Sequence, residues 1–155
     1  APRELFDDMV EKISEDRPQF LTGFGKAFFG VGMLSQPISD ELLQWTHGLT
    51  LQATQKSTID CVRAFSETDF RNDCSAIDIP TLLIHGDDDK TVPIDISSKK
   101  AVTLIKDAQL IIYEGAPHGL FITEKERLNQ DLIDFISSDS AHGFVSKGAY
   151  IEATV

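Results

Sequence analysis

The chain has 155 residues, of which 41% are hydrophobic and 25% are charged, proportions that are ordinary for a globular domain with a sizeable core. Its formal net charge of −11 disfavours nucleic acid and anionic membranes as partners, because like charges repel. The sequence has no apolar run of about 18 residues and no basic segment that leads into an apolar one. We therefore expect a cytoplasmic protein without a transmembrane helix or a signal peptide.

The chain contains two cysteines, Cys61 and Cys74. They lie neither in a C-x-x-C pair nor at a metal-ligand spacing, and a single disulfide between them is the alternative to free thiols. Free, buried thiols are the expected state in a reducing compartment.

Residues 1–75 are predicted to be helical. Pro2 and Pro18 each suit the first turn of a helix, and Ser39 is a typical N-cap for a third. The glycines and proline of residues 30–37 predict a loop, and a further helix is expected over residues 51–65. Several phenylalanines flank the second helix, namely Phe20, Phe24, Phe28 and Phe29. They could line a pocket, but core packing is the favoured interpretation.

The pattern changes in the second half of the chain. Residues 81–85 and 108–115 are short apolar runs typical of strands, and a helix is expected between them over residues 96–105. Thr123 and Glu126 have the spacing of a capping box that opens a last helix, ending near Ile136. Strand, helix, strand, helix predicts an α/β fold with a parallel sheet covered on both faces.

The predicted domain organisation has three parts. Residues 1–75 form a helical region, residues 76–136 form the strands and helices of an α/β core, and residues 137–155 form a tail. The tail has no helical periodicity. It is either disordered or adds a strand near residues 150–155, and the sequence leaves both alternatives open.

Acidic residues and a histidine follow the two predicted strands. Asp87, Asp88 and Asp89 come directly after the first strand, and His118 lies in the loop after the second. Parallel sheets keep their chemistry at the carboxyl ends of strands, so neighbouring strands would bring an aspartate close to His118. An aspartate that orients a histidine forms two-thirds of a nucleophilic triad. The sequence therefore predicts a hydrogen bond of about 2.6–3.2 Å between Asp89 and His118.

The stretches "IPTLLIHGDDDKTVP" and "LIIYEGAPHGLFITEKERLNQDLIDFI" resemble the last third of an α/β-hydrolase. Within that superfamily they are similar to the cofactor-free bacterial haloperoxidases, also described as arylesterases, perhydrolases or γ-lactamases. The stretch "DCVRAFSETDF" resembles the place in this subgroup where a helical cap returns to the sheet. The likeness covers about residues 2–136 and implies the C-terminal portion of the fold, a helical cap followed by the last strands.

The resemblance assigns a role to each residue of the acidic loop. Asp89 matches the triad acid of the family pattern GDxDxxVP, and His118 matches the triad base. Asp87 matches an aspartate that braces its own loop by accepting backbone N–H groups, and Asp88 stands at a variable position. The family implies a small-molecule ester or carboxylic acid as substrate, and a reaction without a cofactor or bound metal.

The chain departs from the family pattern at the nucleophile. The sequence contains no G-x-S-x-G, the motif that carries the catalytic serine. In the family the serine precedes the aspartate and the histidine, so we expect it upstream of Ala1, either in a longer protein or in a complementing chain. An isolated piece would also leave a sheet edge and apolar surface uncovered, which predicts a partner, a homo-oligomer or a swapped dimer, unless the chain refolds into a different structure. Alone, the chain is expected to be inactive as an esterase.

Two other classes of function fit parts of the sequence. The adjacent carboxylates could hold Mg²⁺ or Ca²⁺, although the loop lacks the glycine and distal glutamate of an EF-hand. Alternatively, the helices and phenylalanines of the first half could make the chain a non-catalytic interaction module. The cation-binding alternative leaves the histidine loop without a role.

Overall fold

The structure is a computed structural model that describes residues 2–137 and 149–152. The chain forms two compact units. The first contains residues 1–27 and 31–69, and the second contains residues 28–30 and 70–155. In the described part of the chain, no helix is both long enough and apolar enough to cross a membrane.

The longest helix in the described residues, α1 (Arg3–Phe28), is kinked at Asp16, whose φ of −149° and ψ of 82° are not helical. The Asp16 carboxylate accepts a hydrogen bond of 3.0 Å from the backbone N–H of Gln19 and thereby caps the second segment. Pro18 fits here because the first turn of a helix does not need its missing N–H. The predicted start of a new helix near Pro18 is therefore confirmed.

Two further helices complete the first unit, α2 (Asp40–Thr50) and α3 (Gln55–Glu67). Ser39 caps α2 as predicted, since its hydroxyl accepts the N–H of Leu42 at 3.1 Å. Thr54 caps α3, so this helix begins four residues later than the expected residue 51. Arg17 of α1 donates to the carbonyl of Ala53 at 2.7 Å and thus holds the α2–α3 connection.

The second unit is built on a sheet of β1 (Thr81–Gly86), β2 (Ala108–Tyr113) and β3 (Ala149–Glu152), in that order. β1 and β2 are parallel, with Leu83 opposite Leu110, and β3 pairs antiparallel with β2. The predicted parallel pair is confirmed, and part of the tail forms a strand. The other tail residues, 138–148 and 153–155, lie outside the described part of the chain. The helices of this unit are α4 (Arg71–Ala76), the 3₁₀ turn η1 (Ile94–Ile96), α5 (Ser98–Leu104), α6 (Leu120–Thr123) and α7 (Lys125–Ser137).

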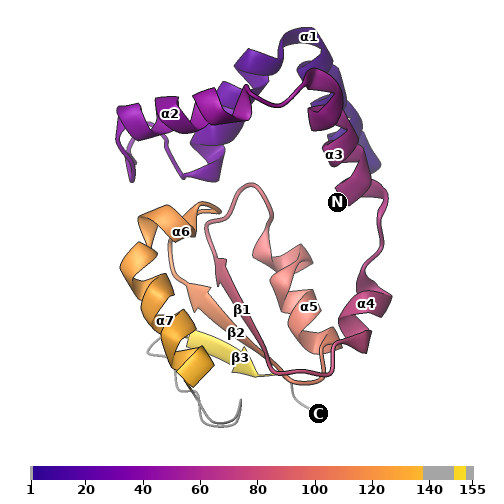
Figure 1. Cartoon of the computed structure of the whole chain (residues 1–155), viewed down its shortest axis with the longest axis vertical. Coiled ribbons are helices and arrows are strands. Elements are labelled where there is room, and N and C mark those ends of the chain that lie inside the picture. Colours follow the sequence, from indigo (N-terminus) through magenta and orange to yellow (C-terminus); the bar gives the residue numbers. More distant parts are fainter. Residues whose placement is uncertain (1, 138–148, 153–155) are drawn as a thin grey trace. The chain divides into compact units, whose positions relative to one another are not determined.

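Helices cover the two faces of this sheet (Figure 1). On one face, Val102 of α5 packs with Leu110 of β2, and both are almost completely buried. On the other face, Ile111 and Tyr113 of β2 pack with Leu128 of α7. Alternate residues of β1 and β2 thus point to opposite helices, as the pleat of a strand requires. This packing sets the direction in which the loops after β1 and β2 leave the sheet.

Some local predictions were wrong. Thr123 does not cap α7: it ends α6, and its buried hydroxyl has no hydrogen-bond partner within the described residues. β1 is half-buried along most of its length rather than covered on both faces. Both cysteines are free, but Cys61 is exposed and Cys74 is only partly buried.

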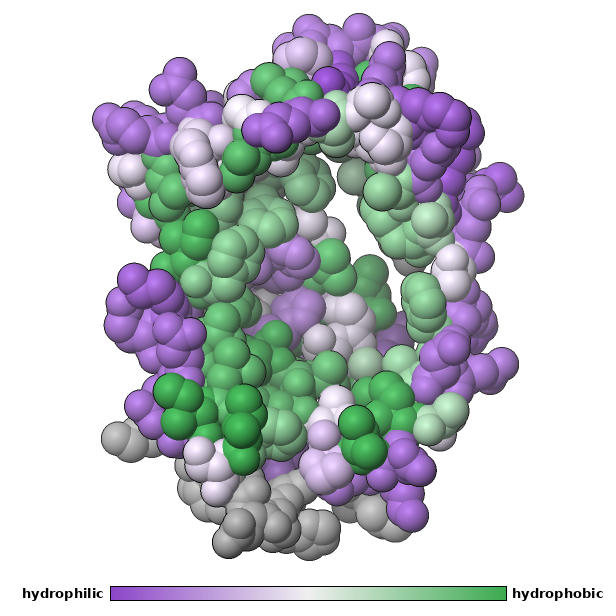
Figure 2. Space-filling view, viewed as in Figure 1, coloured by the Kyte–Doolittle hydropathy of each residue, from purple (hydrophilic) through white to green (hydrophobic). Residues whose placement is uncertain are grey.

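Apolar side chains remain on the surface of the second unit. On α7, Ile133 is 56% exposed and Ile136 is 78% exposed. Figure 2 shows hydrophobic atoms at the surface where α7 ends. β1 is the edge strand of the described sheet, because it pairs only with β2 there. The described sheet therefore ends at β1 with an edge that is not paired there.

Candidate active site

Two loops leave the sheet side by side at the carboxyl ends of β1 and β2. Gly86, the last residue of β1, lies opposite Tyr113, the last residue of β2. The backbone N–H of Asp87 then donates to the carbonyl of Tyr113 at 3.1 Å. A Cβ atom at Gly86 would lie only 2.0 Å from the carbonyl oxygen of Ala116. The close approach of the two loops therefore requires glycine at position 86.

Asp89 and His118 form the predicted hydrogen bond. Nδ1 of His118 lies 2.6 Å from Oδ2 of Asp89. The Asp89 side chain is 2% exposed and that of His118 is 32% exposed. The other carboxylate oxygen, Oδ1, accepts the backbone N–H groups of Thr91 and Val92, each at 2.8 Å. The carboxylate is therefore buried and held in one orientation.

The same hydrogen bond fixes the tautomer of His118. An ionised carboxylate only accepts hydrogen bonds, so Nδ1 carries the proton and Nε2 has a free lone pair in the neutral ring. Within residues 2–137, no group makes a hydrogen bond to Nε2. A neutral imidazole oriented in this way can accept a proton at Nε2, and the adjacent carboxylate stabilises the cation that forms.

Aromatic residues hold the histidine loop. The ring of Phe28 meets the imidazole of His118 edge to face, with the ring centroids 4.7 Å apart. The carbonyl of Phe28 accepts the N–H of Gly119 at 2.7 Å. A Cβ atom at Gly119 would lie 2.4 Å from the ring of Phe29. The sequence favours core packing for these phenylalanines. That interpretation is incomplete, because Phe28 and Phe29 also contact the histidine loop.

The other two aspartates have separate partners. Oδ1 of Asp87 accepts the backbone N–H of Gly115 at 2.6 Å. Asp87 thus ties its loop to the histidine loop, and the expectation that it braces its own loop needs this correction. Asp88 forms an exposed ion pair with Lys90 at 2.6 Å. The hydrogen bond and the charge of Asp88 raise the pKa of Lys90.

His85 also belongs to this site, and sequence reasoning missed it. Nε2 of His85 lies 3.1 Å from Oδ2 of Asp89, the oxygen that also accepts from His118. The sequence pattern indicates only that His85 ends an apolar strand. Side-chain alternation along β1 was the available signal, because it places His85 on the same face as Leu83, toward α5.

The arrangement of the aspartates does not favour a cation site. Their carboxylates point to three different partners, which are Gly115, Lys90 and His118. Within the described residues, no group of three or more His, Cys, Asp or Glu side chains is placed to hold a metal ion. The geometry instead suits proton transfer at His118.

Comparisons with known proteins agree with this fold. Residues 42–125 match a family model described as the alpha/beta hydrolase fold. A non-heme haloperoxidase of Rhodococcus erythropolis is 41% identical over 140 residues, which are 88% of this chain and 50% of that protein. A bifunctional esterase/perhydrolase of Acinetobacter calcoaceticus is 38% identical over 140 residues, again 88% of this chain and 50% of the relative.

Solved structures give the same result. The crystal structure of a bromoperoxidase from Bacillus anthracis superposes with a TM-score of 0.84 at 34% identity, covering 88% of this chain and 49% of that one. An esterase from Exiguobacterium antarcticum gives a TM-score of 0.79 at 29% identity, covering 87% of this chain and 48% of that one. The chain spans about half the length of the relatives it matches, and it resembles their C-terminal half.

Proposed function

Because this chain belongs to the α/β-hydrolase fold family, we propose that Asp89 and His118 are the acid and the base of a serine hydrolase. The observation that carries the proposal is the hydrogen bond of 2.6 Å between them, which leaves Nε2 of the imidazole for a nucleophile. The relatives' names, haloperoxidase and esterase/perhydrolase, support an acyl-transfer reaction on small esters or carboxylic acids.

The nucleophile is a serine outside these residues. The sequence contains no G-x-S-x-G, and the relatives are about twice as long as the matched region. Either a preceding segment of a longer protein or a complementing chain supplies the serine. The edge of β1 is the place where such a segment adds its own strand, because β1 pairs only with β2 in the described sheet and an unpaired strand edge readily accepts another strand.

The proposed reaction follows the geometry of the pair. Nε2 of His118 takes the proton of the serine hydroxyl as the serine oxygen attacks the ester carbonyl. Asp89 holds the ring and stabilises the imidazolium, which then protonates the leaving alcohol. Water, deprotonated by His118, releases the acyl group as a carboxylic acid. If hydrogen peroxide takes the place of water, the product is a peracid, which can oxidise a halide.

A chimera tests the roles of the two residues. The N-terminal half of the Rhodococcus haloperoxidase is joined to this chain at the aligned position, and hydrolysis of p-nitrophenyl acetate is measured. We expect an active enzyme whose kcat falls by about 10³-fold or more in Asp89→Asn and in His118→Ala. The matched control is Asp88→Asn, which changes the neighbouring carboxylate but should leave kcat unchanged, because that carboxylate pairs with the exposed Lys90 and the backbone bond from Asp88 to Ala116 is kept.

The unfused chain provides the second arm of the test. It should neither turn over p-nitrophenyl acetate nor react with a fluorophosphonate probe, since it lacks the elbow serine. Turnover by the chain alone that disappears in His118→Ala would contradict the missing nucleophile. A chimera that folds and retains full activity in His118→Ala would contradict the catalytic role and favour a non-catalytic interaction module.

A further inference from the structure

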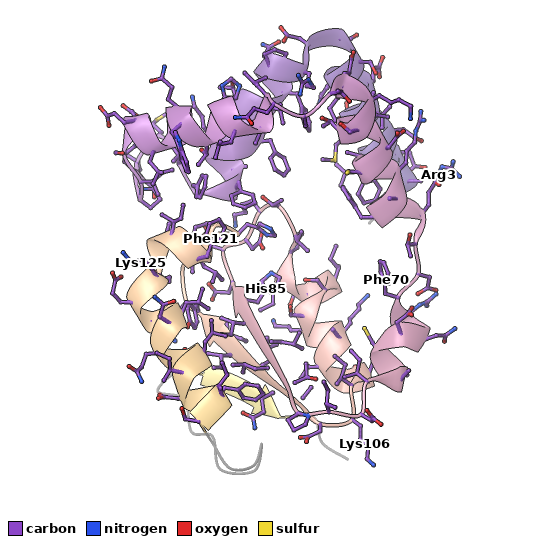
Figure 3. All side chains as sticks on the ribbon, viewed as in Figure 1. Arg3, Phe70, His85, Lys106, Phe121 and Lys125 are labelled. Carbon is purple, nitrogen blue, oxygen red and sulfur yellow. The ribbon has the colours of Figure 1, made fainter. Side chains whose placement is uncertain are left out.

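The side chain of His85 connects three parts of the second unit. It projects from β1 toward α5 (Figure 3) and is 11% exposed. Its Nδ1 lies 2.7 Å from the hydroxyl of Ser98, at the start of α5. Its Nε2 lies 2.9 Å from the carbonyl oxygen of Val92 and 3.1 Å from Oδ2 of Asp89. Strand, helix and acidic loop thus meet at one imidazole.

These partners determine where the proton of His85 resides. A backbone carbonyl and a carboxylate both only accept hydrogen bonds, so Nε2 must be the N–H donor. Nδ1 of the neutral ring is then the acceptor for the Ser98 hydroxyl, which can rotate to donate. Every polar atom of this nearly buried ring is satisfied in a single orientation, which favours a rigid position.

The acidic loop needs an anchor of this kind. The N–H groups of Thr91 and Val92 bind Oδ1 of Asp89, but these groups belong to the same turn and move with it. The hydrogen bond from His85 to the carbonyl of Val92 joins that turn to β1. The hydrogen bond between His85 and Ser98 then joins β1 to α5. The N–H of His85 also lies beside Oδ2, so it restricts how this oxygen can turn relative to His118.

We propose that His85 is a positioning residue that sets the direction of the Asp89 carboxylate toward His118. The proposal rests on the proposed function for its catalytic consequence, but its structural content concerns only the described residues of this chain. Because the histidine base requires one tautomer, a loosened carboxylate would let the His118 proton exchange between its two nitrogens.

Substitutions with matched chemistry separate positioning from packing. In His85→Gln, the amide Nε2 can reach the place of the imidazole Nε2 and donate to the carbonyl of Val92. In His85→Asn, the amide reaches only the place of Nδ1, next to Ser98. Both variants are polar and both lose the ring. A difference between their spectra or activities therefore measures the effect of the N–H donor beside Asp89. His85→Leu removes both hydrogen bonds.

The test is NMR of this chain with ¹⁵N-labelled imidazoles. We expect the His118 Nδ1 proton to be resolved far downfield and in a single tautomer in the unmodified chain and in His85→Gln. In His85→Asn and His85→Leu, that signal should be lost to exchange with water and the ring nitrogens should show mixed tautomers. In the active chimera, His85→Asn and His85→Leu should each lower kcat by about tenfold with KM unchanged. His85→Gln should retain the kcat of the unmodified chimera.

The opposite results overturn the inference. If His85→Asn retains the sharp downfield proton and the single tautomer, the donor beside Asp89 does not position the pair. If His85→Leu fails to fold, the comparison of the glutamine and asparagine variants still decides. The NMR result does not depend on a serine. A chimera that is inactive in every form would therefore contradict the proposed function, and the NMR spectra alone would decide this inference.

Discussion

Each of the three adjacent aspartates after β1 has a different partner. Asp87 accepts the N–H of Gly115, Asp88 pairs with Lys90, and Asp89 accepts from His118. Because the side chains diverge, hydrogen bonds and a counter-ion offset the repulsion between neighbouring negative charges. The run of acidic residues therefore combines a link between loops, a surface ion pair and the candidate catalytic acid.

Asp87 and Asp88 provide a matched pair of substitutions. Asp87→Ala leaves the N–H of Gly115 without its partner and removes this side-chain link between the two loops, so the free energy of unfolding should fall by about 1 kcal/mol. Asp88→Ala removes only an exposed ion pair and should leave the urea midpoint unchanged. Urea unfolding of the two variants checks the difference. Equal midpoints would show that the link between the loops contributes nothing measurable.

At this scale the sequence predicted the central pair but not its surroundings. Asp89 and His118 could be placed together because each follows a predicted strand, and parallel neighbours end at the same edge. His85 and the carbonyl of Val92 could not be paired, since their contact depends on how the loop turns back over the strand. The family resemblance implied that Asp87 braces its own loop, and the sequence gives no sign of how closely the two loops approach.

At the level of the elements, a buried polar contact fastens β2 to α7. The hydroxyl of Tyr113 donates to Asp131 at 2.6 Å, and both residues are buried. The guanidinium of Arg127 lies 3.8 Å from the centre of the Tyr113 ring. Burial, followed by the hydrogen bond and the charge of Asp131, raises the pKa of the Tyr113 phenol, and Arg127 opposes the shift.

This contact predicts a loss of stability at alkaline pH. In the unfolded chain the phenol titrates near its ordinary pKa of about 10. The folded state retains the proton to higher pH, so the stabilisation is complete below about pH 10 and is lost as the pH rises above it. Tyr113→Phe should lower the free energy of unfolding at neutral pH by about 1–3 kcal/mol, because it leaves the buried Asp131 without this donor.

Urea unfolding between neutral pH and about pH 11 measures both effects. The unmodified chain should lose stability steeply above about pH 10, and Tyr113→Phe should show a shallower slope there, because its phenylalanine does not ionise. The matched substitution Phe121→Leu, at a half-exposed position of the same unit, should leave the alkaline slope as it is. An identical slope in Tyr113→Phe would mean that other groups cause the alkaline loss.

The elements themselves were predictable where one local signal dominated. Pro18 marked the second segment of α1, and Ser39 marked α2, because caps and first turns depend on neighbouring residues only. Thr123 and Glu126 have the spacing of a capping box, yet Thr123 ends α6 instead. The short helix before α7 occupies the residues that the capping box would have needed. Local spacing does not reveal such a competing element.

At the scale of the whole molecule, β1 presents a sheet edge. On the side of β1 that faces β2, the N–H of Thr81 donates to the carbonyl of Asp107 at 2.8 Å. The N–H of Asp87 donates to the carbonyl of Tyr113 at 3.1 Å. Successive residues of a strand point their N–H groups to opposite sides, so Leu83 and His85 also face β2. The N–H groups of Leu82 and Ile84 face the open edge instead. An edge of this kind pairs readily with another strand.

Amide hydrogen exchange by NMR tests whether a strand is added there. In the dilute, monomeric chain, Leu82 and Ile84 should exchange at least about tenfold faster than Leu83 and His85. In the chimera with the N-terminal half of the Rhodococcus relative, all four amides should be protected, because a neighbouring strand now accepts the outer pair. If the chain alone associates at higher concentration, as sedimentation would show, protection of Leu82 and Ile84 should rise in parallel. Protection of both amides in a proven monomer, or their continued fast exchange in an active chimera, would contradict the proposed docking edge.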